Sequence, residues 1–508
     1  MTATLFLVTV ALFFSHFLCV SHGFFFSDPL RCRHSSACRS SQGDNEQSTT
    51  SIKVGIIGAG SIAFGTASLM ASLGHDPMLW SPGTGTKELI QKAQSSDAPT
   101  ITSEMQATGS LQLMEQALTA SEATIMSKIQ STGALSQEFD VRIAHSARDL
   151  VRSNDNILVV ALPVNCHKNV MDEFVPDIIE WMKEHKQLMR IIISSHASLG
   201  AVYLMQRLRS EWLSGSSATL SEFDDNIRIT CLGTTVITAR KTSGTSVNVL
   251  TVRKAVDYCT VPIELEQDTN DVLQTLFGPR FKYRDGGLLA ISLSNLNPQN
   301  HLAIVLGNMS RMDPPPPPPP LNDMPVADVI VEPWYQGKCI TPKVGRLMEA
   351  LDLERINIAK ELNIDVRTIY EHFSWSFHVP LETPLGKDEK SGQDGETMRP
   401  LSVSEMNQQM HYYKKNDVLG PTDPESRYVI EDVPYGLVLT VILGRLLNCP
   451  ASLHESGIHI LSAMYGRDFL VENVLLQGLG LIDDDGLNVE AYSMQEWKEM
   501  ARLGYFRE

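Results

Sequence analysis

One histidine and one asparagine in this chain have the spacing to handle a proton and a small substrate together. His301 follows Asn297 by four residues in the run N-P-Q-N-H, so a helix would place both side chains on one face. An imidazole donates and accepts protons near neutral pH, and an amide can orient a substrate beside it. The alternative is a core histidine whose ring is hydrogen-bonded to a backbone carbonyl.

A glycine-rich turn provides a second candidate site, suited to phosphate. The residues from Gly58 to Ala63 read G-A-G-S-I-A after an apolar run, which matches the GxGxxG/A fingerprint in its usual strand–turn–helix context. The first glycine permits a tight turn, and the second lets the backbone approach a pyrophosphate. The helix N-terminus stabilises negative charge. We therefore predict a dinucleotide site that includes Gly58, Gly60, Ser61, Ile62 and Ala63.

The residues after the second predicted strand bear on which dinucleotide is bound. An NAD site usually carries Asp or Glu about twenty residues beyond the glycines, to bind the ribose hydroxyls. Here no carboxylate appears after that strand before Glu88, whereas several side chains could contact a 2′-phosphate. These are Ser81, Thr84, Thr86 and Lys87. We predict NADP(H) rather than NAD(H), with Ser81 as a contact; an ordinary solvated loop is the alternative.

Apolar runs separated by helical stretches dominate the chain up to Val236. They predict an α/β Rossmann-type doubly wound parallel sheet in residues 51–284. The predicted strands are Lys53–Ile57, Pro77–Trp80, Asn156–Leu162, Arg190–Ser195 and Arg228–Leu232. Since ligands bind beyond the carboxyl ends of such strands, Pro163 should lie near the nicotinamide. His167 behind it is a minor catalytic candidate, better suited to beginning a helix.

Three further segments carry coarser predictions. The polar stretch 95–139 is interpreted as an inserted helical excursion, and 246–252 with 255–261 as a hairpin-like extension of the sheet. From residue 285 to 508 helical periodicity dominates, for example in 344–362, which predicts an all-helical second domain. A proline-rich insertion at 313–333 and a polar, poorly patterned surface insertion at 387–425 interrupt it.

The composition limits the class of partner. A formal net charge of −17 argues against a nucleic-acid surface, which needs clustered Lys and Arg. The eight cysteines show no CxxC spacing, so we predict neither a metal site nor a disulfide framework. Small molecules are the expected partners, and the sequence leaves the oligomeric state open.

Residues 1–50 differ from the rest of the chain. A short apolar run from Leu5 to Val20 is followed by small residues, three phenylalanines and a Ser/Arg-rich stretch. This order resembles the signal-plus-transit presequences of algae with complex plastids, and it predicts plastid delivery with no membrane span left after cleavage. A retained anchor and secretion, or residence in the endomembrane system, are the alternatives.

Three segments together resemble the octopine/nopaline (opine) dehydrogenase family. They are the run 297–301, the stretch G-K-C-I-T-P-K-V at 337–344, and E-D-V-P-Y-G-L at 431–437. The resemblance covers most of residues 52–481, in the family's order of nucleotide domain and then helical domain. It implies a C-terminal domain like that of 6-phosphogluconate dehydrogenase. It also implies NAD(P)H-dependent reductive condensation of an amino acid with a 2-oxo acid to a secondary amine dicarboxylate, and the reverse oxidation.

The same resemblance assigns roles to four residues. His301 resembles the family's catalytic histidine and Asn297 its substrate-orienting asparagine. Asp432 falls at the position of the carboxylate partner of the histidine. Arg427 falls where the family has an arginine that contacts the cofactor's phosphates. A surface ion pair at a loop is the alternative for Arg427 and Asp432.

Two other functions compete with this interpretation. One is another two-domain dehydrogenase, of the glycerol-3-phosphate or 2-hydroxyacid type, which would typically rely on a catalytic lysine. The other is a nucleotide-binding sensor without turnover.

Overall fold

The structure is a computed structural model, in which Thr50–Glu508 forms one compact unit. It describes residues 51–82, 86, 89, 125–214, 219–263, 268–314, 332–384, 398–414, 417–483 and 485–507. The predicted presequence 1–50, two of the predicted phosphate contacts (Thr84 and Lys87) and most of the proline-rich insertion lie outside these residues. Among the helices within them, none is both long enough and apolar enough to cross a membrane.

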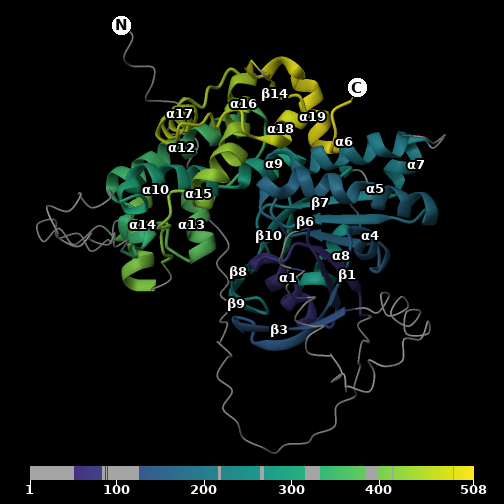
Figure 1. Ribbon diagram of the computed structural model, residues 1–508. Coiled ribbons are helices and arrows are strands. Elements are labelled where there is room, and N and C mark those ends of the chain that lie inside the picture. The colour runs from purple at the N-terminus through teal and green to yellow at the C-terminus, as the bar shows by residue number, and fades with distance from the viewer. Residues whose placement is uncertain are drawn as a thin grey trace, which may run out of the picture. The chain divides into compact units, whose positions relative to one another are not determined.

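Eleven of the described strands form one mixed sheet (Figure 1). Its six central strands, in the order β7-β6-β5-β1-β2-β4, are parallel. In chain order the strands are Lys53–Ile57 (β1), Asp76–Trp80 (β2), Ile125–Gly133 (β3), Gln137–Ile143 (β4), Ile157–Val160 (β5), Met189–Ile193 (β6), Ile227–Leu232 (β7), Ile237–Ser243 (β8), Ser246–Val252 (β9), Val256–Val261 (β10) and Phe281–Tyr283 (β11). The predicted Rossmann-type sheet is therefore confirmed, with antiparallel strands added at both edges.

Helices cover both faces of the sheet, and successive residues of a strand therefore enter different cores. In β6, Ile191 and Ile193 belong to the core under α5 and α6, whereas Ile192 belongs to the core under α1 and α8. The helices of this part are Ser61–Ser72 (α1), Ala147–Arg152 (α4), His167–His185 (α5), Gly200–Leu213 (α6), Leu220–Asp225 (α7) and Thr269–Phe277 (α8).

Helix α1 is enclosed on all sides. The hairpin β8–β9 follows β7 in the chain, packs against α1 and joins the opposite edge of the sheet by pairing β9 with β3. All residues from Ala63 to Met70 are buried, which is why this helix has no polar face. Its small residues permit the close approach, since a Cβ on Gly65 would lie 2.4 Å from Ile237 Cδ1.

Two predictions for the sheet were wrong. Residues 125–139 of the expected helical excursion form the antiparallel hairpin β3–β4, while 95–124 lie outside the described residues. Buried and exposed residues alternate along β3, but two of its three buried residues are serines (Ser127 and Ser131). The alternation of apolar and polar residues that predicts a strand is therefore absent from the sequence. Segments 246–252 and 255–261 both extend the sheet, as predicted, but the expected hairpin pairing between them was wrong, because β9 joins β8 and β3 whereas β10 joins β7 and β11.

Beyond β11 the described chain is mainly helical, as predicted. The helices are Gly287–Ser294 (α9), Asn297–Met312 (α10), Gln336–Cys339 (α11), Pro342–Glu361 (α12), Ile369–Phe377 (α13), Val403–Gln409 (α14), Arg427–Ile430 (α15), Val438–Leu446 (α16), Ser452–Tyr465 (α17), Val474–Gly478 (α18) and Met494–Leu503 (α19). Short helical turns also occur here at Met410–Lys414 (η4), Val433–Leu437 (η5) and Val489–Ala491 (η6), and one more, Val164–Cys166 (η2), lies between β5 and α5. Two short hairpins, Glu382–Pro384 with Met398–Pro400 (β12–β13) and Ile482–Asp483 with Gly486–Leu487 (β14–β15), complete it. The core under α5 and α6 continues into these helices.

The polar insertion predicted at 387–425 is partly core structure. Helix α14 packs on α12 and buries Val403 and Met406. A capping box of Ser402 and Glu405 begins it, a signal that the polar composition of the segment concealed.

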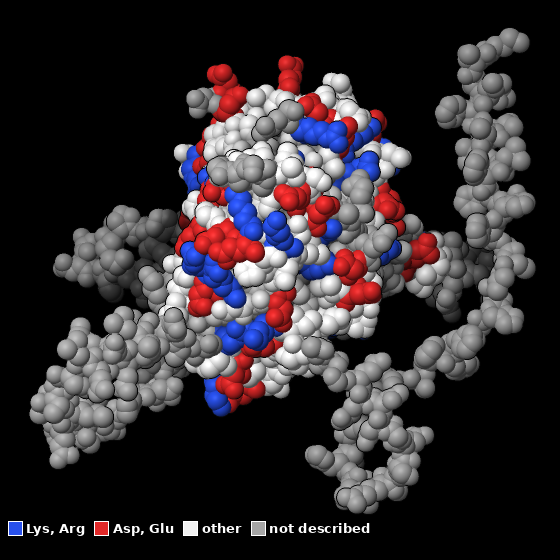
Figure 2. Space-filling view, turned by 90° about the vertical axis from the view of Figure 1, so that its right-hand side faces the viewer, with Lys and Arg blue, Asp and Glu red and all other residues white. Residues whose placement is uncertain are grey.

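A buried ion pair joins four segments of the helical part. Arg355 donates to Asp352 from Nε (3.0 Å) and Nη2 (2.6 Å), and also to the carbonyl oxygen of Leu293 (2.6 Å). Asp352 further accepts from Gln299 Nε2 (2.9 Å) and from the backbone N–H of Ile369 (2.8 Å). By contrast, acidic and basic side chains are interspersed on the surface in Figure 2, where solvent weakens their attraction.

We expect Asp352→Ala to lower the free energy of unfolding by about 3–5 kcal/mol, because it leaves the Arg355 guanidinium buried and unpaired. Denaturant unfolding measures this change. The matched control is Glu138→Ala, which breaks an exposed pair with Lys128 and should change stability little. Equal effects of the two substitutions would contradict the role given to the buried pair.

Candidate active site

A cavity of about 370 Å³ lies at the carboxyl ends of the parallel strands. Its sheet-side wall consists of residues that follow β1, β5, β6 and β7, together with residues of β8 and Arg253. Its opposite wall comes from the helical part, mainly Asn295, Asn297, Pro298, Arg427, Glu431, Asp432, Tyr435 and Gly436. Strand β1 pairs with β2 on one side and β5 on the other, so the cavity occupies the switch point where this fold binds ligands.

The glycine turn has the close packing that its sequence predicts. Gly58 has φ +139°, and a Cβ there would lie 2.5 Å from the carbonyl oxygen of Ala161 and 3.3 Å from Cβ of Ala63. Gly60 is different, because no atom lies within 4 Å of a Cβ built on it and the residue lines the cavity. Ser61 and Ile62 line it too. The turn thus leaves space for a phosphate at the N-terminus of α1, where backbone N–H groups lack acceptors.

Ser81 lies at the end of β2, next to the glycine turn. The backbone N–H of Gly58 donates to the carbonyl oxygen of Trp80 (2.7 Å), and Thr86 Oγ1 donates to that of Ser81 (2.8 Å). Ser81 is therefore close to the turn without lining the cavity itself. Pro163, at the end of β5, does line the cavity.

The structure brings His301 and Asp432 together beside the cavity. Nδ1 of His301 donates to Oδ2 of Asp432 (2.6 Å), and the imidazole stacks on the ring of Tyr428 with centroids 3.5 Å apart. Burial raises the pKa of Tyr428, so this ring stays uncharged at neutral pH. With Nδ1 bonded to the carboxylate, Nε2 is the nitrogen left to exchange a proton. Asn297, the first residue of α10, lines the cavity one turn before His301.

Arg427 is joined to the sheet through Glu431, the first residue of the 431–437 motif, for which the sequence predicted no role. Arg427 donates to both carboxylate oxygens of Glu431, from Nε and from Nη2 (3.0 Å). Glu431 Oε1 also accepts from the backbone N–H of Val164 (3.1 Å) at the end of β5. The Arg427 side chain remains 66% exposed, whereas that of Glu431 is only 7% exposed. The arginine can therefore still reach a ligand in the cavity.

Other cavity residues could have been found with the same rule that identified Pro163. Ser194 and Ser195 follow β6, and Thr234 and Thr235 follow β7, so all four lie at carboxyl ends of parallel strands. Arg240 and Arg253 had no comparable signal, because they line the cavity only through the path of the β8–β9 hairpin.

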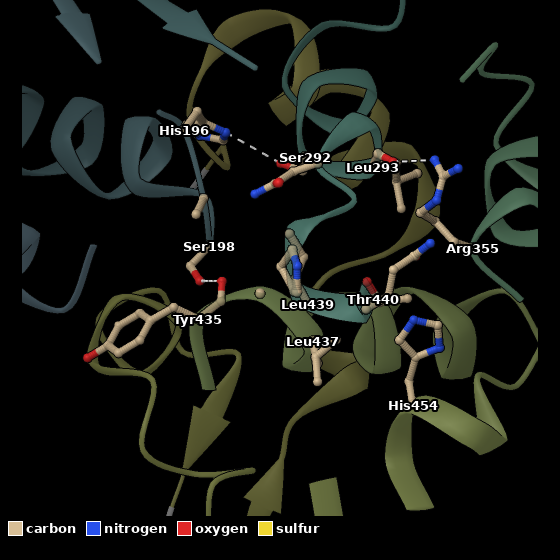
Figure 3. A pocket seen from close by; sticks show the side chains of 15 residues that line it. His196, Ser198, Ser292, Leu293, Arg355, Tyr435, Leu437, Leu439, Thr440 and His454 are labelled. Atoms are coloured by element: carbon tan, nitrogen blue, oxygen red, sulfur yellow. Dashed lines mark hydrogen bonds between the residues drawn. The ribbon is translucent and has the colours of Figure 1, made fainter. Parts of the chain in front are cut away.

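The buried histidines near the site are structural in character. His167 begins α5, as predicted, does not line the cavity, and has a pKa lowered by burial to about 4. His196 belongs to a smaller cavity of about 20 Å³ that adjoins the first (Figure 3). Its ring faces Ser292 there, and burial lowers its pKa to about 3. Neutral rings of this kind are poor candidates for proton transfer at neutral pH.

The segments that carry Asp432 and His301 approach each other closely. A Cβ on Gly436 would lie 2.2 Å from Cγ of Pro298, so only glycine allows the turn η5 to meet the start of α10 at this distance. The close approach of these two segments lets Asp432 and His301 pair with each other at the edge of the cavity.

Comparison with known proteins finds similarity to the family that the sequence motifs resemble. Residues 284–465 match the model for the NAD/NADP octopine/nopaline dehydrogenase alpha-helical domain. The chain is also 33% identical over 142 residues to an opine dehydrogenase of Arthrobacter sp. (strain 1C), a match that covers 28% of this chain and 34% of that protein. The matched region thus spans about a third of the curated relative's length. The resemblance to the opine dehydrogenases is confirmed.

Two solved structures share the fold at low identity. An octopine dehydrogenase with NADH and L-arginine has a TM-score of 0.55 and 15% identity, covering 84% of this chain and 92% of that chain. A yersinopine dehydrogenase with NADP+ bound has a TM-score of 0.53 and 13% identity, covering 89% and 98%. The protein therefore shares the fold of these structures, a Rossmann-like sheet followed by a helical domain.

We expect Gly58→Ala and Gly60→Ala to differ in their effects. The first forces a side chain into a positive-φ position against Ala161 and should destabilise the protein by about 1–3 kcal/mol, with loss of nucleotide binding. The second meets no protein atom, so it should weaken nucleotide binding without changing stability. Thermal unfolding and NAD(P)H fluorescence titration measure the two quantities. If Gly60→Ala bound nucleotide as well as the parent protein, the cavity beside α1 would not be the phosphate site.

Proposed function

We propose that this opine dehydrogenase-like protein uses NAD(P)H to condense an amino acid with a 2-oxo acid into a secondary amine dicarboxylate, and catalyses the reverse oxidation. The observation that carries the proposal is the His301–Asp432 hydrogen bond of 2.6 Å, at the edge of a cavity whose other wall is the dinucleotide turn. Asp432, the carboxylate bonded to His301, and the dinucleotide turn therefore line one space.

The residues present fit a nicotinamide nucleotide. Gly60 leaves its side-chain position open to the cavity, the N-terminus of α1 can accept a pyrophosphate, and Pro163 stands at the end of β5. When bound, the reduced nucleotide supplies the hydride of the reaction.

The chain's own residues would manage the protons. The substrate amine attacks the carbonyl carbon of the oxo acid to give a carbinolamine, whose hydroxyl leaves as water once it is protonated. Nε2 of His301 would donate that proton, and the resulting imine is reduced to the secondary amine. Asp432 would hold the imidazole in one tautomer and stabilise its cationic form. The net reaction consumes one amine, one oxo acid, one hydride and one proton, and it releases one water.

Asn297 and Arg427 would position the ligands. Asn297 lines the cavity on the same helix face as His301, where its amide can hold a substrate carboxylate or amine. Arg427 can form a bidentate contact with a phosphate while Glu431 fixes its position against β5.

The cavity lining favours this reaction over one that depends on a lysine. No lysine is found among the described residues that line the cavity. The nearby Lys241 donates from Nζ to the carbonyl oxygen of Ala59 (3.2 Å) and lies over the ring of Phe64. A nucleotide-binding sensor is the outcome if cofactor binds but no substrate pair is turned over.

We propose NADP(H) as the preferred cofactor. Ser81 follows β2 beside the glycine turn, at the position where an NAD site usually carries a carboxylate. A carboxylate there would repel a 2′-phosphate, whereas Ser81 would not. The Thr86 hydroxyl donates a hydrogen bond to the carbonyl oxygen of Ser81.

We expect His301→Gln to lower kcat by about 10²–10⁴-fold, since the amide cannot act as an acid or base, while NADPH affinity is unchanged. Oxidation of NADPH and NADH with pyruvate and a panel of amino acids measures turnover, and fluorescence titration measures affinity. The matched control is His411→Gln, because His411 forms a similar pair with Asp417 (3.0 Å), which does not line the cavity, whereas Asp432, the partner of His301, does. Parallel loss of turnover and nucleotide binding in His301→Gln would mean a structural role.

We expect Ser81→Asp to shift the ratio of kcat/KM for NADPH over NADH by at least about 10-fold towards NADH, because the carboxylate repels a 2′-phosphate and accepts hydrogen bonds from ribose hydroxyls. Steady-state kinetics with both cofactors test this. An unchanged ratio would refute the proposed preference.

A further inference from the structure

A side pocket of about 100 Å³ adjoins the main cavity. It lies between the sheet and helix α13, and it shares Thr234, Arg253, Asn295 and Asn297 with the main cavity. A pocket of this size holds several water molecules or a short polar group. A substrate held by Asn297 could therefore extend into it.

The acidic residue in the wall of the side pocket is already neutralised. Asp257 accepts two hydrogen bonds from Arg367, from Nη1 (2.5 Å) and Nη2 (3.1 Å), and a third from Arg284 Nη2 (3.2 Å). Both of its oxygens are thus used by guanidinium groups. This carboxylate is not available to bind a cationic ligand.

Unpaired polar atoms gather around the same pocket. Arg253 Nε, Ser294 Oγ and Ser376 Oγ are buried without a hydrogen-bond partner among the described residues, and all three residues line the pocket. No ion pair of Arg253 is found there either. Buried polar groups in native proteins are normally satisfied, so three in one wall indicate a ligand or water that accepts hydrogen bonds.

The remaining lining makes the pocket cationic and aromatic. The guanidinium of Arg367 lies over the ring of Trp375, 4.2 Å from its centroid. Burial, together with the neighbouring Arg253, Arg355 and Arg367, lowers the pKa of His372 to about 4, so this ring is neutral at pH 7. The positive charge of Arg253 therefore has no carboxylate to balance it in the pocket wall.

We propose that the side pocket binds a carboxylate on the side chain of the amino acid substrate, so that the protein condenses acidic amino acids. The inference rests on the proposed function and adds the substrate class. Arg253 would form the charged contact, the hydroxyls of Ser294 and Ser376 would donate to the same group, and Asn297 would hold the substrate at the junction with the main cavity. A cationic side chain, such as that of the L-arginine bound to the octopine dehydrogenase above, would meet Arg253 and be repelled.

Kinetics with L-glutamate, L-aspartate, L-alanine, L-arginine and agmatine, each with pyruvate, test the substrate class. We expect L-glutamate or L-aspartate to have the highest kcat/KM, and L-arginine and agmatine to be poor substrates. Arg253→Met should raise KM for the acidic amino acid by roughly 10- to 100-fold while changing KM for L-alanine little, since alanine has no side-chain carboxylate. A preference for L-arginine, or equal losses for L-glutamate and L-alanine, would overturn the proposal.

Two further variants distinguish a loss of the carboxylate contact from a folding defect caused by Arg253→Met. Lys254→Met is the matched control, because Lys254 is the next residue along and is exposed, and it should behave as the parent protein. Ser376→Ala removes one donor without removing charge, and it should raise KM for L-glutamate by a smaller factor than Arg253→Met. Unchanged KM in both Arg253→Met and Ser376→Ala would contradict the proposed contact.

Binding without turnover separates this inference from the proposed function. With NADPH present, L-glutamate should change the tryptophan fluorescence of the parent protein, and the change should be lost in Trp375→Phe and weakened in Arg253→Met. If L-glutamate binds in this way but no substrate pair is turned over, the proposed reaction fails and the carboxylate pocket stands. If reaction occurs with L-alanine while L-glutamate gives no Trp375 signal, the pocket assignment fails and the reaction stands.

Discussion

The hydrogen bonds of Glu431 are the constraint on which the site depends. This nearly buried carboxylate accepts hydrogen bonds from the Arg427 side chain and from the backbone N–H of Val164. Val164 lies 267 positions earlier in the chain. One side chain therefore fixes the segment 427–436 of the helical part against the end of β5. Asp432 follows directly, and through it the orientation of His301 is set. Removing a partner from such a group would leave a buried charge without compensation, so the arrangement tolerates little change.

Much of the fold and part of the site could be predicted from local patterns. Central strands and long helices carry strong apolar periodicity, and the glycine turn and the Asn297–His301 spacing are local motifs. The β3–β4 hairpin was missed because serines occupy inward positions, where Ser131 accepts a hydrogen bond from Ser68 of α1. Glu431, Arg253 and the α13 residues could not be predicted, since their place at the cavity depends on packing between segments far apart in the sequence.

The two cavities differ in what surrounds their charged groups. At the main cavity Arg427 is paired with Glu431, and His301 with Asp432, so each of these two groups has a fixed carboxylate. At the side pocket two arginines, Arg284 and Arg367, share Asp257, and Arg253 has no ion pair among the described residues. A carboxylate partner holds a catalytic group in one orientation, so that it can act on a reacting atom. An unpaired guanidinium instead favours ligands that carry a negative charge.

Enclosure of α1 by the β8–β9 hairpin has a consequence for how the chain reaches its native state. Strand β9 pairs with β3, more than a hundred residues earlier, and closes over a helix that belongs to the first βαβ unit. Contacts between such distant segments form slowly, because a long loop must be closed first. The first βαβ unit would therefore be left uncovered on a partly synthesised chain. Competence to hold a nucleotide would then arise only after about half of the polypeptide has been made.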